Sequence, residues 1–361
     1  MIIVSTILAI IGILAILFIT TDGIIAFNEW QQRIHIGRWS DRKNWQKAIE
    51  KKAKEWLYHS PTVSIKDQSR LLLWDILQGN YRSSTIQSWQ DAGLLLGLNN
   101  KEDATAYVKS HLNLFNSNMQ CDVALLAYAF KKQGVLSTEY ETIVKSLFQT
   151  YNDNNETIPY RKQLPDIRFV DTIGLTCPFL YACGYHHLAK RQMEEYEQTL
   201  FNHAFPPHAY DLRQHKPMGV FDWSRGTGWY ILGLIETAEL EGNKERILQL
   251  ASSLLSFMRP EGGLNCMYFN QQERYESSGS ALSGLLYTKA YELSNDKRYL
   301  EAARKTEQSL MKATRRNGAI DFAQGDTKGI GFYSRQFSIM PFAQGMALYL
   351  SKQLDKFENQ K

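Results

Sequence analysis

Apolar residues recur every three or four positions over most of the chain beyond about residue 39, which is the spacing of amphipathic helices. Signals for strands are scarce. A short apolar phrase rich in glycine and alanine, ending in polar residues, recurs along this region. Its copies begin at Ala92, Ala124, Pro178, Trp229, Ala281 and Phe342. From the second copy onward the spacing is roughly fifty residues, which is the length of two helices with their loops.

Longer and more charged helical patterns lie between these copies, for example at 245–259 and 297–313. Because glycine and alanine let helices approach closely, we expect the repeated phrases to form an inner ring and the charged helices an outer ring. The pattern therefore predicts an all-α fold, an (α/α)6 toroid of six helical hairpins. An open superhelical solenoid is also built from stacked helix pairs, but six repeats favour a closed ring.

The N-terminal segment differs from the rest, because Ile2 to Thr21 contains no charged residue and no proline. A helix of this length spans about 30 Å, the thickness of a bilayer core. A cleaved signal peptide is the alternative, but no basic residue precedes the apolar run and its end is a poor cleavage site. The sequence therefore predicts a single-pass transmembrane anchor at 1–22, a juxtamembrane linker at 23–38 and a helical domain at 39–361.

The orientation of this anchor follows from the basic residues after it, which are Arg33, Arg38, Arg42, Lys43 and Lys47. Basic residues beside a span keep their side of the chain in the cytoplasm. We therefore expect a cell-membrane protein with its helical domain in the cytoplasm. The four cysteines show no metal-ligand spacing and agree with a reducing compartment. Since the repeats begin after the anchor, we expect the domain from about Trp39 to fold without it.

Composition excludes one large class of partner. A formal net charge of +4 on 361 residues is too dilute for nucleic-acid binding, which needs basic residues clustered on one face. Aromatic residues make up 12% of the chain; they serve either as large core residues or as platforms that stack on flat ligands.

Charged residues stand at the start of nearly every predicted inner helix. In a toroid of antiparallel hairpins these starts line one mouth, so the residues there converge. They are Asp91, Asp122, Asp171, Arg225, Glu276 with Ser280, and Arg335. Carboxylates at such positions can simply cap the helices. Cations are unfavourable at a helix N-terminus, so a bound anion would account for the two arginines.

Two phrases indicate chemistry. At 168–181 the sequence RFVDTIGLTCPFLY places Asp171 at the start of an apolar helix, where burial raises the pKa of a carboxyl as a general acid requires. At 223–229 the sequence WSRGTGW offers Trp223 and Trp229 for stacking, Arg225 for an anionic group and glycines for close ligand approach. A phosphate-binding loop is excluded because its lysine and preceding strand are missing.

From about residue 39 onward the chain resembles the unsaturated glucuronyl and rhamnogalacturonyl hydrolases, glycoside hydrolase families 88 and 105. The resemblance rests on five elements in order: Asp122, VDTIGLTCPFL at 170–180, HAYD at 208–211, WSRGTGW at 223–229 and YESSGSA at 275–281. Thr227 replaces the usual asparagine, and Ser277 and Ser280 replace threonines. These departures bear on substrate preference more than on the reaction. The membrane anchor is atypical of the family.

The resemblance implies that the substrate is an unsaturated uronyl oligosaccharide, the product of a polysaccharide lyase. The enzyme hydrates the C4=C5 double bond, and the resulting hemiketal opens to release the rest of the chain. Asp171 matches the general acid/base and Asp122 the second carboxylate. Sugar contacts are expected from His208, Asp211, Trp223, Arg225, Trp229, Glu276 and Ser280. The resemblance implies neither a metal nor another cofactor.

Two other functions fit the same residues. An inverting glycosidase or a sugar epimerase could use Asp122 and Asp171, since inverting hydrolysis requires two carboxylates flanking the bond. A non-catalytic, membrane-tethered glycan-binding factor is the third possibility. It is the least favoured, because binding alone does not require two apposed carboxylates.

Overall fold

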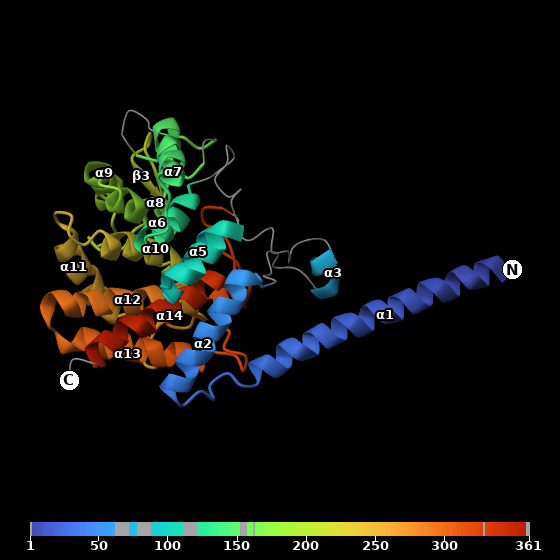
Figure 1. Cartoon of the computed structure of the whole chain (residues 1–361). Coiled ribbons are helices and arrows are strands. Elements are labelled where there is room, and N and C mark those ends of the chain that lie inside the picture. Colours follow the sequence, from blue (N-terminus) through green and yellow to red (C-terminus); the bar gives the residue numbers. More distant parts are fainter. Residues whose placement is uncertain are drawn as a thin grey trace.

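The computed structural model describes residues 2–61, 72–77, 88–110, 121–151, 157–161, 163–327 and 329–358. Figure 1 shows a helical body from which one long helix projects, with the N-terminus at its far tip. The body contains the repeats predicted from the sequence. We describe its inner ring first, because the inner helices position the candidate site.

The described residues form an inner ring of six helices, each packed against the next. They are α4 (Ser88–Leu98), α6 (Val123–Lys132), α8 (Val170–Ala182), α10 (Ser224–Glu236), α12 (Ser277–Ser294) and α14 (Pro341–Glu358). The last of them, α14, packs against the first, α4, so the ring is closed. Each copy of the repeated phrase begins inside one of these helices. The predicted (α/α)6 toroid is confirmed, and the open solenoid is excluded.

The outer helices each bury one face against this ring. They are α2 (Arg42–Tyr58), α5 (Lys101–Ser110), α7 (Thr138–Tyr151), α9 (His186–Glu197), α11 (Asn243–Leu255) and α13 (Lys297–Lys312). Helix α13 illustrates how the sequence sets their bounds. Asp296 caps it by accepting a hydrogen bond from the backbone nitrogen of Arg298 at 3.0 Å. Apolar residues such as Leu310 are buried, while the lysines and arginines stay outside.

Glycines make the closure of the ring possible. A Cβ atom on Gly345 of α14 would overlap the backbone of Gly93 and lie 2.6 Å from the backbone nitrogen of Leu94. Gly97 of α4 faces the backbone of Gly345 just as closely. The two helices therefore touch backbone to backbone, which only residues without a side chain allow.

Short antiparallel ribbons lead into the inner helices. The first sheet has the order β1 (Ile167–Phe169), β2 (Ala209–Asp211), β3 (Lys216–Met218), and β1 continues directly into α8. The strand β4 (Leu264–Asn265) pairs with β5 (Tyr275–Glu276), which leads into α12. The third ribbon pairs β6 (Ala323–Gln324) with β7 (Phe337–Ser338), ahead of α14. These ribbons fix the segments that precede the inner helices.

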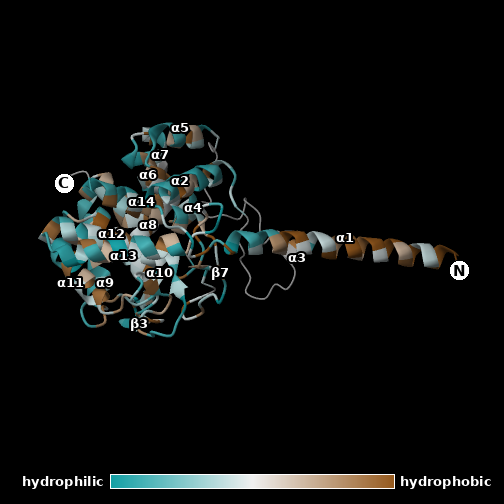
Figure 2. Ribbon diagram, turned by 90° about the horizontal axis from the view of Figure 1, so that it is seen from below, coloured by the Kyte–Doolittle hydropathy of each residue, from teal (hydrophilic) through white to brown (hydrophobic). Residues whose placement is uncertain are grey.

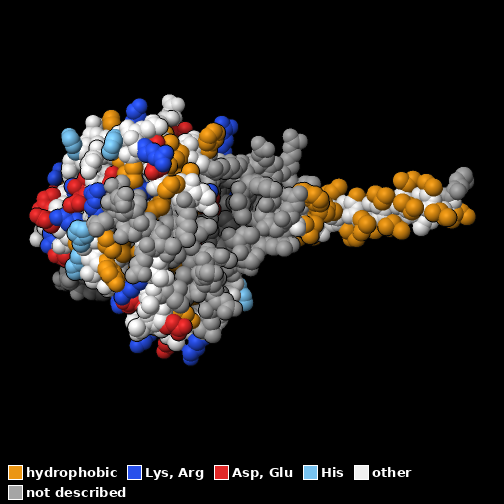
Figure 3. All heavy atoms as spheres, turned by 90° about the horizontal axis from the view of Figure 1, so that it is seen from above, with side chains coloured by type: hydrophobic (Ala, Val, Ile, Leu, Met, Phe, Trp, Pro, Cys, Tyr) orange, Lys and Arg blue, Asp and Glu red, His pale blue; other side chains and the backbone are white. Residues whose placement is uncertain are grey.

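The projecting helix α1 (Ile2–Arg33) buries no residue. Figure 2 shows it hydrophobic toward the N-terminus, and Figure 3 shows its apolar side chains facing outward along the rod. Among the described residues it is the one helix long and apolar enough to cross a membrane, and a signal sequence would have the same properties. The short helix α3 (Leu72–Leu77) lies beside it, with Trp74 against Phe18 at a ring distance of 6.3 Å.

The segment 23–38, expected to be a linker, is helical as far as Arg33 and contacts the body. Arg33 forms an ion pair with Asp321 at 2.7 Å, and Glu29 forms one with Arg315 at 2.6 Å. The end of α1 is therefore docked on the toroid. The predicted domain boundary near Trp39 therefore separates Glu29 and Arg33 from their ion-pair partners in the body.

We expect Gly345→Ala to destabilise the toroid, because the added methyl group would force α14 away from α4. Overpacking of a tight core contact costs about 1–3 kcal/mol or more. Thermal unfolding should therefore show a lower Tm. The control is Gly23→Ala, where nothing lies within 4 Å of the added Cβ atom. Equal Tm values for the two variants would show that the ring does not depend on this contact.

Candidate active site

A cavity of about 260 Å³ opens where the inner helices begin. Five residues predicted from the sequence line it, which are Asp171, His208, Trp223, Arg225 and Trp229. A larger cavity of about 600 Å³ lies elsewhere, lined by residues such as Arg33, Arg274 and Phe337, and contains none of the predicted site residues. The smaller cavity is therefore the candidate active site.

Asp171 lies in the first turn of α8, and the neighbouring sheet fixes its position. Strand β1 pairs with β2, and the backbone nitrogen of Val170 donates to the carbonyl of His208 at 3.0 Å. Burial, with a smaller contribution from the charge of Asp326, raises the pKa of Asp171 to about 6, although a backbone hydrogen bond and the charge of Arg225 oppose this shift. Its Oδ2 atom is buried and has no hydrogen-bond partner among the described residues. This carboxyl is therefore suited to hold a proton and transfer it to a ligand.

Arg225 is a buried cation held by backbone carbonyls. Its Nη2 donates to the carbonyl of Gly325 at 2.7 Å and its Nη1 to the carbonyl of Gln324. The guanidinium lies over the Trp223 ring at 5.4 Å, and it forms no ion pair with any carboxylate of the described residues. Because carbonyls do not neutralise its charge, the cavity carries a fixed positive charge that favours an anionic ligand.

His208 is neutral in this environment. Burial, together with the charge of Arg225, lowers its pKa to about 4. Its Nδ1 is 3.0 Å from the hydroxyl of Tyr333, and its ring lies 4.7 Å from Trp223. Trp223 in turn donates through Nε1 to Oε1 of Gln324 at 3.0 Å. His208 and Trp223 thus form an aromatic wall of the cavity, and hydrogen bonds to Tyr333 and Gln324 hold the two rings in place.

Trp229 belongs to a second aromatic cluster, with its ring 5.4 Å from Trp89 and 4.6 Å from Phe342. The glycines of the same phrase were expected to allow close ligand approach, but the structure gives them another role. A Cβ atom on Gly226 would overlap the Trp223 ring, and one on Gly228 would meet Leu282 at 2.5 Å. Gly226 therefore makes room for the Trp223 ring over the start of α10, and Gly228 lets α10 pack closely against α12.

Asp122, the predicted second carboxylate, precedes α6 and does not line the cavity. Ser88 donates to its Oδ2 at 2.8 Å, and burial raises its pKa. Asp122 nevertheless lies near the site, because the adjacent Cys121 directs its Sγ to the backbone carbonyl of Tyr160 at 3.8 Å, and Tyr160 lines the cavity. Burial raises the pKa of Tyr160, and the charges of Asp171 and Asp122 add to this.

Asp211 is the last residue of β2 and precedes the turn that leads to β3. Its Oδ1 accepts from the backbone nitrogens of Arg213 at 2.9 Å and Gln214 at 3.0 Å, which is the usual way an aspartate stabilises a turn. It does not line the cavity.

Glu276 and Ser280, also predicted as sugar contacts, are fully buried and engaged by the protein itself. The carboxylate of Glu276 caps α12 by accepting from the backbone nitrogens of Ser278 at 3.1 Å and Gly279 at 2.6 Å. The hydroxyl of Ser280 accepts from the backbone nitrogen of Leu264 at 2.8 Å. Both residues fix the start of α12 and lie outside the cavity.

Sequence reasoning missed Asp326, Thr327, Gly329 and Ile330, which line the cavity from the loop between β6 and β7. It also missed Tyr333 beside His208. This loop lies outside the repeated phrases and outside the resemblance, so the search for charges at helix starts passed over it. The pairing of β6 with β7 is the observation that brings it to the mouth of the toroid.

Comparison with known proteins gives a result only at the level of structure. No protein-family model matches the chain, and no curated protein matches it in sequence. A Salmonella enterica protein described as a possible member of glycoside hydrolase family 105 superposes with a TM-score of 0.70 at 17% identity, covering 88% of this chain and 96% of that one. The unsaturated glucuronyl hydrolase of Bacillus sp. GL1 superposes with a TM-score of 0.63 at 16% identity, covering 92% and 97%.

This chain has the fold of the family 88 and 105 hydrolases. A family 88 glycosyl hydrolase from Bacteroides vulgatus agrees, with a TM-score of 0.62 at 15% identity over 88% of this chain and all of the other. A protein described as a polysaccharide lyase superposes comparably, with a TM-score of 0.63. Proteins described with different reactions thus share this toroid, so the fold alone does not identify the reaction and the residues of the cavity have to.

We expect Asp326→Asn to lower the pKa of Asp171, because a neighbouring negative charge disfavours ionisation of the second carboxyl. NMR titration of carboxyl-labelled aspartate would measure the shift. The control is Asp166→Asn, since Asp166 pairs with Arg213 at 2.8 Å outside the cavity. If the pKa of Asp171 is unchanged in the Asp326 variant, the charge of Asp326 does not influence Asp171.

Proposed function

We propose that this chain is a membrane-anchored glycoside hydrolase that acts on unsaturated uronyl oligosaccharides by hydrating the C4=C5 bond of the terminal sugar. The observation that supports it most is Asp171, a carboxyl with a pKa of about 6. Within the part of the chain that the structure describes, one of its oxygens has no hydrogen-bond partner, and Arg225 of the same cavity has no carboxylate partner. A proton donor beside a fixed cation suits an anionic substrate that must be protonated on carbon.

The proposed reaction begins with proton transfer from Asp171 to C4. The electron pair of the C4=C5 bond forms the new C–H bond, and the ring oxygen stabilises the positive charge left on C5. Water adds to C5 and gives its proton to the Asp171 carboxylate, which restores the acid. The hemiketal at C5 then opens to a ketone, and the hemiacetal left at C1 releases the remaining sugar as an alcohol. The net change is the addition of one water molecule.

The other cavity residues would bind and orient this substrate. Arg225 is proposed to bind the uronic carboxylate with N–H groups left over from its two backbone carbonyl partners. The aromatic wall of Trp223 and His208 offers a flat face for the sugar ring. Because the pKa of His208 is lowered to about 4, it would act as a neutral hydrogen-bonding group.

The second carboxylate has two candidates. The resemblance assigns the role to Asp122, which lies near Tyr160 and outside the cavity lining. The geometry adds Asp326, which lines the cavity with Asp171. We propose that Asp122 orients groups around the acid, while Asp326 helps to keep Asp171 protonated.

A solved neighbour supports a glycan substrate, since it is an unsaturated glucuronyl hydrolase variant whose description names the oligosaccharide dGlcA-Glc-Rha-Glc. We further propose that α1 crosses the cell membrane once and that its basic flank keeps the toroid in the cytoplasm. The substrate would then be supplied by a polysaccharide lyase, the class of enzyme that creates the C4=C5 bond.

An inverting glycosidase is the second candidate, because Asp171 and Asp326 line one cavity and such enzymes use two carboxylates. Ultraviolet absorbance distinguishes the two functions. Hydration removes the absorbance of a 4,5-unsaturated disaccharide, whereas hydrolysis of a saturated substrate leaves absorbance unchanged.

We expect Asp171→Asn to lower kcat on an unsaturated disaccharide by at least about 10²-fold, the usual minimum for losing a general acid. KM should change little, since asparagine keeps the shape and the hydrogen bonds. The matched control is Asp211→Asn, at the end of β2 and outside the cavity lining, which should remain active. Asp122→Asn should also lose activity. If the Asp171 variant keeps more than about a tenth of wild-type kcat, the acid is another residue and Asp122 becomes the first candidate.

The activity should also depend on pH in a stated direction. A general acid works in its protonated form, and the pKa of Asp171 is raised to about 6. We therefore expect kcat/KM to be level below pH 6 and to fall about tenfold per pH unit above it. His208, with a pKa near 4, should not contribute in this range. A profile that rises between pH 6 and 8 would contradict the role of Asp171 as proton donor.

A further inference from the structure

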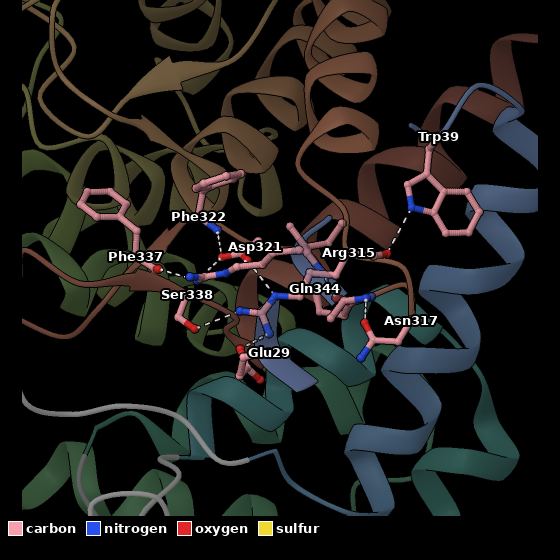
Figure 4. A network of polar contacts seen from close by, with 12 residues as sticks. Glu29, Trp39, Arg315, Asn317, Asp321, Phe322, Phe337, Ser338 and Gln344 are labelled. Carbon is pink, nitrogen blue, oxygen red and sulfur yellow. Dashed lines mark hydrogen bonds and ion pairs between the residues drawn. The ribbon is translucent and has the colours of Figure 1, made fainter. Parts of the chain in front are cut away.

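The end of α1 meets the toroid in a cluster of charged side chains around Asp321 (Figure 4). Asp321 is fully buried and accepts from Arg315 Nε at 2.7 Å. Arg33 of α1 binds the same carboxylate with two nitrogens, Nε at 2.7 Å and Nη2 at 3.1 Å. Glu29, one helical turn earlier, accepts from Arg315 Nη1 at 2.6 Å. The membrane helix thus supplies two of the four charged groups.

The side chains of this cluster form hydrogen bonds to both sides of the hairpin formed by β6 and β7. Asp321 lies two residues before β6, and its Oδ1 also accepts from the backbone nitrogen of Phe322 at 2.7 Å. On the other strand, Arg33 Nη2 donates to the carbonyl of Phe337 at 3.2 Å. Arg315 Nη2 donates to the hydroxyl of Ser338 at 3.3 Å. Arg33 and Arg315 therefore each join Asp321, at the start of the hairpin, to its second strand.

The same hairpin carries part of the candidate active site. Gln324 and Gly325 supply the carbonyls that hold Arg225. The loop beyond them contributes Asp326 to the cavity lining and places the hydroxyl of Tyr333 against His208. A shift at the base of the hairpin would consequently move groups that touch the ligand.

The charges in the cluster are strongly coupled. Burial alone would raise the pKa of Asp321, but Arg315 and Arg33 outweigh burial and hold it below its ordinary value. Without Arg33 the carboxylate still has Arg315, so we expect the fold to survive. Arg315 also keeps its bond to Ser338, so the loss of Arg33 removes one of two side-chain links between Asp321 and β7, the one that ends on the backbone of Phe337.

We propose that Arg33 is a positioning residue: through Asp321 and Phe337 it fixes the β6–β7 hairpin, and thereby the cavity wall that the hairpin supplies. The membrane helix is then part of the support of the active site as well as an anchor. The catalytic consequence rests on the proposed function, whereas the effect on the hairpin does not.

The test compares the full chain in detergent with its Arg33→Ala and Arg33→Lys variants by amide hydrogen exchange. Peptides covering 323–326 and 335–338 should exchange about tenfold faster in the alanine variant, since a charge-assisted contact is lost. The lysine variant should be intermediate, because an ammonium can pair with Asp321 but cannot reproduce the three-way contact. The peptide at 264–276, in the neighbouring β4–β5 ribbon, should not change.

The matched control is Arg42→Ala. Arg42 ties α2 to α13 and α14 through Glu307 and Asp355, each at 2.7 Å, and makes no contact with the hairpin. It should speed exchange in α2 and leave 323–338 unchanged. Equal exchange of the hairpin in wild type and Arg33→Ala would overturn the proposal.

Kinetics add the catalytic readout. On an unsaturated disaccharide, Arg33→Ala should raise KM several-fold with a smaller change in kcat. The KM of Arg33→Lys should lie between those of the wild type and the alanine variant. A merely structural loss would reduce the active fraction and leave KM unchanged. If the hairpin amides exchange faster in Arg33→Ala while KM and kcat stay unaltered, the proposed effect of Arg33 on the cavity wall is overturned. If the wild type shows no turnover, the proposed function fails, and hydrogen exchange alone decides whether Arg33 fixes the hairpin.

Discussion

The backbone contact between α4 and α14 is the constraint on which the site depends. Gly93, Gly97 and Gly345 let these two helices touch, so the sixth inner helix can return to the first. A closed ring brings the starts of helices far apart in sequence to one mouth. Asp171 and Arg225 begin two helices that pack directly on each other, α8 and α10, and closure of the ring adds Trp89 of the first inner helix to the same cavity. The complete lining of the cavity therefore depends on packing between small residues.

Electrostatics at the mouth follow from the same arrangement. Arg225 is buried where a helix begins, a position unfavourable for a cation, and backbone carbonyls rather than a carboxylate hold it. Its charge stays available and lowers the pKa of His208, while Asp171 keeps a raised pKa through burial. One cavity thus contains a protonatable acid, a neutral histidine and a fixed cation. An anionic sugar with an electron-rich double bond would use all three.

The sequence predicted the fold well, because the Gly/Ala-rich phrases at a period of roughly fifty residues report directly on helices packed in a ring. It also predicted the cavity residues that stand at helix starts, such as Asp171 and Arg225. The sequence analysis assigned Glu276 and Ser280 to ligand binding. In the structure Glu276 caps α12, and Ser280 accepts a hydrogen bond from the backbone of Leu264. A carboxylate that binds a sugar and one that caps a helix look alike in a sequence. Asp326 and Tyr333 were missed, since a loop reaches the cavity through strand pairing that no local pattern encodes.

The docking of α1 on the hairpin escaped the sequence for a related reason. Arg33 was counted as a basic flank of the membrane span, while its partner Asp321 lies 288 residues later. Only the folded toroid brings the two together. The end of α1 is thereby held on the toroid by ion pairs.

In the proposed reaction the bond changes occur at C4 and C5 of the substrate and not at its glycosidic bond. A sulfur-linked analogue of the unsaturated disaccharide distinguishes the two sites, because its glycosidic bond resists acid-assisted hydrolysis while its double bond remains available. We expect the protein to remove the ultraviolet absorbance of this analogue at a rate similar to that of the oxygen-linked disaccharide. Cleavage of the oxygen-linked disaccharide without any turnover of the sulfur-linked one would contradict it.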